Sequence, residues 1–445
     1  MDENLKKFNE KKTYSKQNTA KEVFTFIAII FPLAFLFYVI YVSYQKSQIK
    51  PLLSNFLEGK NLSISEYEKL YNFYGINLKD KEGNTLLHRL TLKVCSQKMN
   101  SIPPLIPRLL KDGLSPNERN RKGQTPLHLA AAYCKDEDTL KKLLSLFLKF
   151  GGDINAKDCA GNTPLFYTID YDAYNPQIRT LLKFNPNVNV KNYYGWTPLC
   201  KAAFFDIGTS FQLLQKYGGN IREKCGEVSI PELVKTLSSR KVANYLEKLG
   251  IGFKEIKELK GNLKKLLFKS SINTFCVKED FEKNIENAVA FSIYFDQADR
   301  VKAFFKHSLF SLNSTITSKE FPDTKLKSFS PLLLAVYSKS CSPKVLSYFL
   351  TLGVNPNKRL ENGKTLLHIC VERGCVECAK LLIENGADVH LKDKKGFTPY
   401  CIAVANGRKR VVKELLTYGA NPKDPCVEMA KLLREMEEFS QDTLW

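Results

Sequence analysis

The sequence predicts an all-α solenoid, in which two-helix units joined by β-turn fingers stack on one another. A motif that begins at Asn362 and ends at His368 starts again at Asp393, and the threonines Thr365 and Thr398 lie 33 residues apart. After each motif the apolar residues follow helical spacing through two short runs. A fixed period of this size is typical of repeat architectures, in which each unit buries its apolar face against its neighbours.

The composition agrees with such an architecture. A chain of 445 residues is too long for one compact core, but a solenoid avoids that limit because each unit contacts only its neighbours. With 44% apolar and 11% aromatic residues, the chain is not of the disordered class. The formal charge of +21 can attract nucleic acid, anionic lipid or acidic proteins. A lysine-rich surface that only keeps the protein in solution is the other interpretation.

The N-terminal region predicts a membrane anchor. Residues 1–22 form a polar, lysine-rich tail, and residues 23–44 contain no charged side chain. As a helix, the second segment would be roughly 33 Å long, enough to cross the hydrocarbon core of a bilayer. Tyr38, Tyr41 and Tyr44 gather at one end of it, where aromatic rings favour the interface. We therefore expect a single-pass membrane protein with a transmembrane helix over 23–44.

Two signals disagree on the side of the membrane that the repeats face. More lysines precede the predicted span than follow it closely, which places the N-terminus in the cytoplasm and the repeats on the far side. All 12 cysteines follow the span, and several fall at helix positions that we expect to be buried. Unpaired thiols in that number favour a reducing compartment, so the side of the repeats and the pairing of the cysteines stay open.

Further copies of the motif divide the rest of the chain. Copies begin at Asp80, Asn120, Asp158 and Asn192, each with a glycine three residues later and a threonine two residues after that. From 225 to 320 the motif fades while the period persists. The predicted parts after the anchor are, in chain order, N-terminal capping helices (50–79), repeats (80–224), divergent repeats with an extended loop (225–328), repeats (329–422) and a C-terminal capping helix (423–445).

Each residue type of the motif has a structural reason. The glycine allows a backbone conformation at the finger tip that other residues adopt only with strain. The threonine hydroxyl caps the first helix, and the proline after it suits the first helical position. The segment from Thr125 to Ala131, which reads Thr-Pro-Leu-His-Leu-Ala-Ala, resembles the ankyrin repeat. The resemblance covers residues 80–220 and 330–422, and it implies a protein-binding scaffold without catalytic residues that works through finger tips and inner helices.

The finger tips hold the candidate partner-binding residues. Three aromatic side chains surround Gly195, where they could form a binding hot spot because such residues bury much area at low entropic cost. Packing against adjacent fingers is the alternative. The complete set of candidates comprises four aromatic and four basic residues: Tyr193, Tyr194, Trp196, Phe397, Arg121, Lys122, Lys394 and Lys395.

Histidines and cysteines suggest no chemistry of their own. His88, His128 and His368 share one place in the motif, where the resemblance implies a hydrogen bond to the neighbouring finger. Cys375 and Cys378 form a Cys-x-x-Cys pair, but no second pair at zinc spacing accompanies it, so a buried structural role is favoured over a metal or redox role.

We therefore predict a membrane-anchored scaffold for a protein partner, with no catalytic, metal-binding or cofactor-binding residues. Two alternatives stay open. One is a basic scaffold for anionic lipid or nucleic acid, which strong salt dependence of binding would favour. The other is an enzyme or a regulatory activity in the divergent region 225–328.

Overall fold

The computed structural model describes most of the chain from residue 46 to residue 429. In full, it describes residues 38, 43–44, 46–97, 101–169, 176–253, 256, 259, 262–268, 275–312, 314, 316, 330–338, 341–360, 362–429 and 432. The described residues fall into two compact units: unit 1 comprises those up to 134 and 142–152, and unit 2 comprises 135–141 and those from 153 onward.

The membrane prediction is corrected. No helix in the described part of the chain is long and apolar enough to cross a bilayer. The longest of these helices, α14 (Phe275–Tyr294), has 20 residues but carries charged side chains such as Lys278 and Asp280. The predicted tail 1–22 and nearly all of the predicted span 23–44 lie outside the described residues. A single-pass membrane localisation is therefore not supported.

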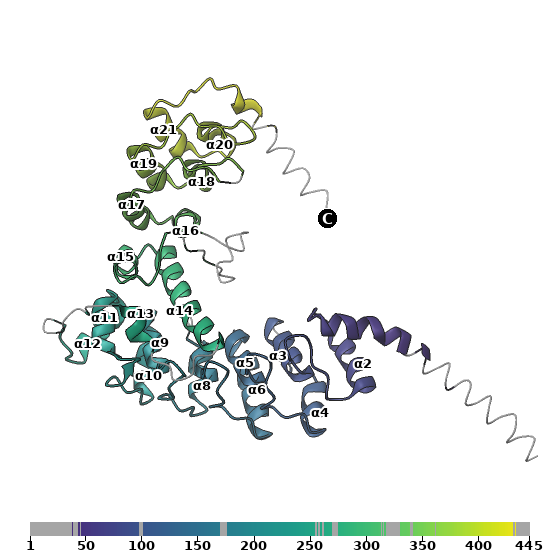
Figure 1. Cartoon of the computed structure of the whole chain (residues 1–445). Helices are drawn as coiled ribbons and strands as arrows, with labels where there is room; N and C mark the ends of the chain where they lie inside the picture. The colour runs from purple at the N-terminus through teal and green to yellow at the C-terminus, as the bar shows by residue number, and fades with distance from the viewer. Residues whose placement is uncertain are drawn as a thin grey trace, which may run out of the picture. The chain divides into compact units, whose positions relative to one another are not determined.

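Unit 1 is a stack of short helices (Figure 1). Its elements are α2 (Ile64–Tyr74), α3 (Leu86–Ser96), α4 (Leu105–Lys111) and α5 (Pro126–Tyr133), and α6 (Glu137–Lys149) crosses the boundary between the two units. Helix α3 packs against α2, α4 and α5.

Unit 2 continues as helix pairs with one small hairpin (Figure 1). Its elements are α7 (Pro164–Tyr167), α8 (Pro176–Leu182), α9 (Pro198–Phe204), α10 (Gly208–Lys216), β1 (Lys224–Cys225), β2 (Val228–Ser229), α11 (Ile230–Thr236), α12 (Arg240–Lys248), α13 (Leu263–Leu267), α14, α15 (Ala298–Lys306), α16 (Pro331–Tyr337), α17 (Pro343–Thr351), α18 (Leu366–Arg373), α19 (Val376–Glu384), α20 (Pro399–Ala405) and α21 (Lys409–Thr417). The strands β1 and β2 pair antiparallel.

The helices of unit 2 form an inner and an outer layer. Within the C-terminal part of the unit, α14, α16, α18 and α20 pack in sequence as inner helices, and α15, α17, α19 and α21 pack in sequence as outer helices. Leu382 of α19 and Leu415 of α21 are fully buried between the layers. This arrangement confirms the predicted all-helical solenoid, because each pair buries its apolar face against the next pair.

The motif residues build the fingers as expected. In the finger from Asp158 to Thr163, the carboxylate of Asp158 accepts hydrogen bonds from the backbone N–H groups of Ala160 and Asn162, both at 2.9 Å. Gly161 lies between them at φ +80°, and a Cβ there would meet the backbone nitrogen of Tyr193 at 2.7 Å. Any other residue would therefore separate this finger from the following one.

The threonines of the motifs stand at the N-cap positions of the inner helices. Thr85, Thr365 and Thr398 have extended backbone angles immediately before α3, α18 and α20. In the divergent region Ser229 takes the same role before α11, where its hydroxyl and the Glu232 side chain form a reciprocal capping box. Most of the predicted extended loop and of the predicted C-terminal capping helix (423–445) lies outside the described residues, which include only 423–429 and 432 of the helix.

Candidate functional site

The fourth finger, which carries Tyr193, Tyr194 and Trp196, is mostly covered. Tyr194 and Trp196 are fully buried, and only Tyr193 keeps part of its surface exposed. The prediction that these three residues form an exposed aromatic surface is therefore wrong for two of them. Phe397, the aromatic candidate in the last clear finger, is also buried, at 6% exposure.

Helix α14 is the element that covers the fourth finger. The hydroxyl of Tyr194 donates a hydrogen bond to Asp280 at 2.9 Å and accepts one from the Asn284 side chain at the same distance. Phe281 packs its ring 5.3 Å from the ring of Tyr194 and 5.8 Å from the ring of Trp196. The N-terminal half of α14 thus occupies the place where a partner had been expected.

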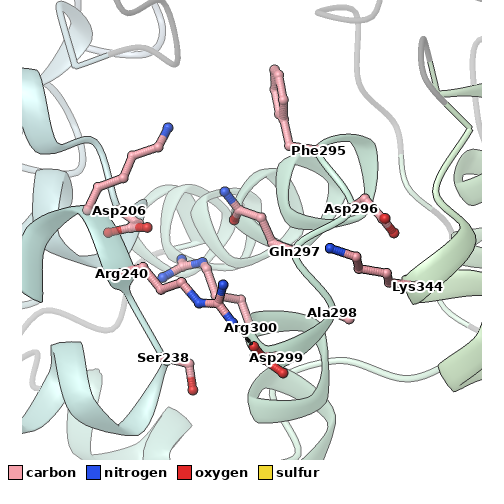
Figure 2. Close-up of a pocket in the computed structure, with 11 residues that line it drawn as sticks. Asp206, Ser238, Arg240, Phe295, Asp296, Gln297, Ala298, Asp299, Arg300 and Lys344 are labelled. Carbon is pink, nitrogen blue, oxygen red and sulfur yellow. Dashed lines mark hydrogen bonds and ion pairs between the residues drawn. The ribbon is translucent and has the colours of Figure 1, made fainter.

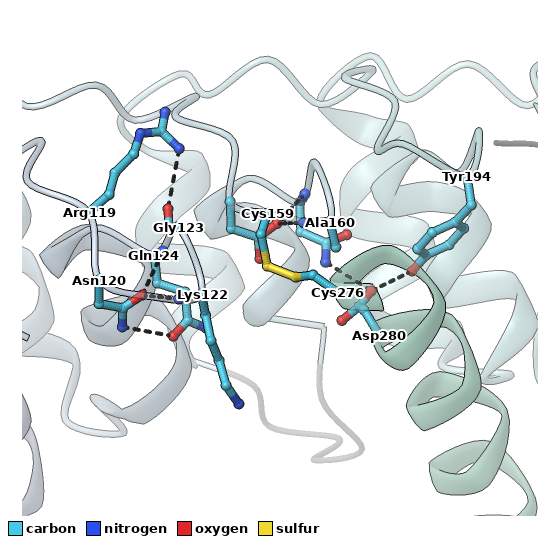
Figure 3. The surroundings of a disulfide bond; sticks show 12 residues. Arg119, Asn120, Lys122, Gly123, Gln124, Cys159, Ala160, Tyr194, Cys276 and Asp280 are labelled. Atoms are coloured by element: carbon cyan, nitrogen blue, oxygen red, sulfur yellow. Dashed lines mark hydrogen bonds between the residues drawn. A yellow bond between two sulfur atoms is a disulfide. The ribbon is translucent and has the colours of Figure 1, made fainter. Parts of the chain in front are cut away.

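A second contact fixes α14 to the third finger. Cys159 forms a disulfide with Cys276 in the first turn of α14, and Asn162 donates a hydrogen bond to Asp280 at 3.0 Å (Figure 3). Within that finger, Asp158 accepts a hydrogen bond from the Tyr167 hydroxyl at 2.5 Å. Burial, opposed by the Tyr167 hydrogen bond and aided by the nearby Asp280 carboxylate, raises the pKa of Asp158 to about 6.

The motif histidines join successive fingers. Nδ1 of His368 accepts hydrogen bonds from the backbone and hydroxyl of Thr365, and its Nε2–H donates to the carbonyl of Phe397 at 3.0 Å. His88 makes the corresponding bond to the carbonyl of Gln124 at 2.9 Å. Both rings are fully buried, so burial lowers the pKa of His368 and lowers that of His88 to about 4. These neutral rings connect one repeat to the next, which agrees with the structural role that the resemblance implied.

Comparison with known proteins places the repeats in a family. The family described as Ankyrin repeats (3 copies) matches residues 131–225 and 332–426. These two segments are ankyrin repeats. They include the covered fourth finger and the finger that carries Lys394 and Lys395.

Individual relatives match only parts of the chain. Protein phosphatase 1 regulatory subunit 27 of Homo sapiens is 40% identical over 14% of this chain and 39% of its own length. The B-cell lymphoma 3 protein homolog of Mus musculus is 39% identical over 19% of each chain. The chain therefore spans well under half of either relative. Among solved structures, the ankyrin repeat domain of Bcl-3 aligns with a TM-score of 0.38 and 19% identity, covering 51% of this chain and 96% of that one.

In two ankyrin repeats a cysteine occupies the place of the motif histidine. Cys200 and Cys401 follow their motif threonines by three residues, as His368 does. Cys200 forms a disulfide with Cys225 in the next finger, and Cys401 forms one with Cys426, each 25 residues further along the chain. In these two repeats a disulfide to the next finger replaces the hydrogen bond that the motif histidine makes elsewhere.

A second set of disulfides lies at the opposite ends of the inner helices. Cys95, at the end of α3, pairs with Cys134, the C-cap of α5. Cys341, after α16, pairs with Cys375, which precedes α19. Each bond links the C-terminal end of one inner helix, or the loop after it, to the corresponding place in the next repeat. Spacing along the sequence did not reveal these pairs, because a set of cysteines allows many connectivities.

The Cys-x-x-Cys pair does not form a metal site in this arrangement. Cys375 is bonded to Cys341, whereas Cys370 and Cys378 are free, buried thiols. Burial and the neighbouring Cys378 raise the pKa of Cys370 well above the usual range, so its thiol stays protonated and unreactive. A group formed by Cys401, Asp424 and Cys426 has metal-like spacing, but its two sulfurs are bonded to each other and cannot act as thiolate ligands.

The basic candidates are the finger-tip residues that remain accessible. Arg121 and Lys122 are exposed on a finger of unit 1, and Lys394 and Lys395 are exposed on a finger of unit 2.

The sequence did not lead us to predict the residues of α14 that cover the fourth finger, where we had expected a partner to bind. The signal that could have found them is the helical spacing of buried Val277, Phe281 and other residues further along the helix.

Proposed function

We propose that this chain is a protein-interaction scaffold that binds its partner through the exposed basic finger tips and the inner helices beside them. Ankyrin repeats imply a scaffold of this kind, and they support a protein partner whose identity is open. The observation that carries the proposal is the combination of rigid fingers with exposed basic tips. One similar protein is named as a regulatory subunit of a phosphatase, which agrees with this class of function.

The fingers hold their tips in a fixed position. Lys394 N–H donates to the carbonyl of Asn362 in the preceding finger at 3.2 Å, and the carboxylate of Asp393 accepts from the backbone N–H of Lys395 at 2.9 Å. A partner that binds such tips loses little entropy to ordering the scaffold, because the backbone is already fixed. The charge of +21 gives an acidic partner a favourable approach.

Site-specific cross-linking tests the proposal. We would place a photo-reactive residue at Lys394 of the full chain and expect one protein to be captured there, whereas the same residue at Lys409 on α21 captures little. Lys394→Glu with Lys395→Glu should reduce capture by about tenfold. Lys409→Glu with Lys413→Glu changes the net charge equally on an outer helix and serves as the control.

Two outcomes would overturn the proposal. The first is equal capture from the finger tip and from α21, because that shows general adhesion to a basic surface. The second is loss of capture after nuclease treatment, which would assign the basic surface to nucleic acid. An unchanged circular dichroism spectrum of both double variants shows that the comparison concerns folded protein.

A further inference from the structure

A charged cavity lies on unit 2 at the ends of the helices that face away from the fingers. Its volume is ≈ 360 Å³, and it is lined by three loops that link inner to outer helices and by the first turns of α12, α15 and α17 (Figure 2). The loop residues Asp206, Ser238 and Asp296 all have positive φ angles, of 57°, 51° and 52°. Each also stands between an inner and an outer helix, in the pairs α9–α10, α11–α12 and α14–α15, so the three residues hold equivalent places.

Two of these three loops supply a carboxylate that accepts a hydrogen bond from an outer helix of the next helix pair. Asp206 accepts a hydrogen bond from the backbone N–H of Val242 in the first turn of α12 at 2.9 Å. Asp296 accepts one from Val345 in the first turn of α17, also at 2.9 Å. The middle loop has Ser238 instead, so in the part of the chain that the structure describes this loop offers no carboxylate to the first turn of α15. The cavity opens at the position where the repeat lacks its acidic side chain.

Four basic and three acidic side chains line the cavity, so its lining keeps a small positive excess. Arg240 forms an ion pair with Asp299. In the described part of the chain, the exposed Lys241 and Lys344 form no ion pair within 4 Å, and Figure 2 shows the ammonium group of Lys344 directed into the cavity. Arg300 adds a guanidinium group at the floor, where it is 3% exposed and donates to the carbonyl of Phe204 at 2.7 Å.

The surroundings favour a chain segment over a small anion. A second hollow of ≈ 430 Å³ adjoins the first and shares Ala298, Asp299 and Lys344 with it. The two together give space for several residues of an extended peptide. Phe295 stands at the rim with 53% of its surface exposed, which offers a contact for an apolar side chain.

We propose that this cavity binds an acidic segment of a partner protein, with a Glu or Asp side chain at the place left open by Ser238 and an apolar neighbour against Phe295. The proposal rests on the proposed scaffold function and names the chemistry of the partner. Lys241 and Lys344 flank the bound carboxylate from α12 and α17, as charge-assisted donors.

The test uses a fluorescein-labelled peptide in which glutamates flank a leucine, with anisotropy as the readout and the full chain as the receptor. Lys241→Glu with Lys344→Glu should weaken binding by about tenfold or more. Lys248→Glu with Lys413→Glu carries the same charge change on exposed outer-helix positions and should weaken binding by less than about twofold. A peptide with glutamine in place of glutamate should not bind.

Ser238→Asp is the sharper variant. The new carboxylate would fill the open place from within, as Asp206 and Asp296 do, so peptide binding should fall by about tenfold while the chain stays folded. Ser238→Gly accepts the same positive φ, adds no carboxylate and should bind as the parent chain does. Phe295→Ser should weaken the binding of the glutamate–leucine peptide but not the binding of a peptide in which glycine replaces the leucine.

Three results would overturn the inference. One is an equal loss of binding in the cavity and control double variants, which would mean that the peptide responds to net charge only. Another is unchanged binding to Ser238→Asp. The third is full competition by succinate, which would assign the cavity to small carboxylates. If the peptide fails while cross-links at Lys394 persist, the inference falls and the proposed scaffold function stands.

Discussion

Removal of one disulfide between neighbouring ankyrin repeats should destabilise the chain by a predictable amount. Cys200 and Cys225 are fully buried and bonded across 25 residues. Their joint replacement, Cys200→Ala with Cys225→Ala, removes the bond and leaves no unpaired thiol. Closing a loop of this length lowers the entropy of the unfolded chain, which corresponds to about 3.5 kcal/mol of stability. Lost sulfur packing adds roughly 1 kcal/mol.

Two assays read this loss. Urea unfolding of the oxidised proteins should show a lower midpoint for the double variant. Hydrogen exchange should show the largest loss of protection in α9 and α11, because the bond joins the finger before α11 to α9 and each repeat depends on its neighbours.

A reductant supplies the decisive control. In excess phosphine the parent chain loses the same bond, so parent and variant should then differ by only the roughly 1 kcal/mol of packing. The reasoning is refuted if the oxidised parent and variant unfold together, or if peptide mapping without reductant finds Cys200 and Cys225 as free thiols.

Three further predictions concern pH and packing. Unit 1 should lose up to about 3 kcal/mol of stability as the pH falls from 6.5 to 4, because the pKa of His88 is lowered to about 4 and the buried ring must gain a proton; His88→Gln should flatten this part of a urea-unfolding profile measured against pH. The effect of Asp158 on stability has the opposite sign, because its pKa is raised to about 6. The stability of unit 2 should fall by up to about 3 kcal/mol as the pH rises from 4 to 7, and Asp158→Asn should remove that loss in the same measurement. Leu382→Asp places a charge in a fully buried position and should melt the neighbouring repeats, so an unchanged calorimetric transition would contradict the assignment of α19 to the core.

The repeat architecture could be predicted because its causes are local. A threonine that caps a helix, a glycine with positive φ and an aspartate that accepts two backbone N–H groups all act within about five residues. The structure confirms these roles at Thr85, Gly161 and Asp158. The resemblance to the ankyrin repeat likewise implied the hydrogen bonds that His88 and His368 make to the neighbouring fingers.

The surface could not be predicted in the same way. Tyr194 and Asp280 are 86 residues apart in sequence, so nothing near the fourth finger shows that a helix covers it. The cysteines pose a similar difficulty, because Cys159 finds its partner 117 residues away. The motif assigns a finger tip to the edge of a repeat, but the rest of the chain decides whether that tip meets solvent.

The cavity at Ser238 lies where inner helices lead into outer helices, whereas the finger tips precede the inner helices, and this separation keeps their effects on binding apart. A seven-residue inner helix such as α11 is about 10 Å long, so one partner could contact both edges while no side chain of this chain reaches from one edge to the other. Substitutions at sites with no shared partners usually add in free energy. Lys394→Glu combined with Ser238→Asp should therefore weaken the binding of a protein that contacts both the finger tips and the cavity. The combined fold loss in affinity should equal the product of the two single fold losses. A protein that responds to only one of the two substitutions uses only that edge.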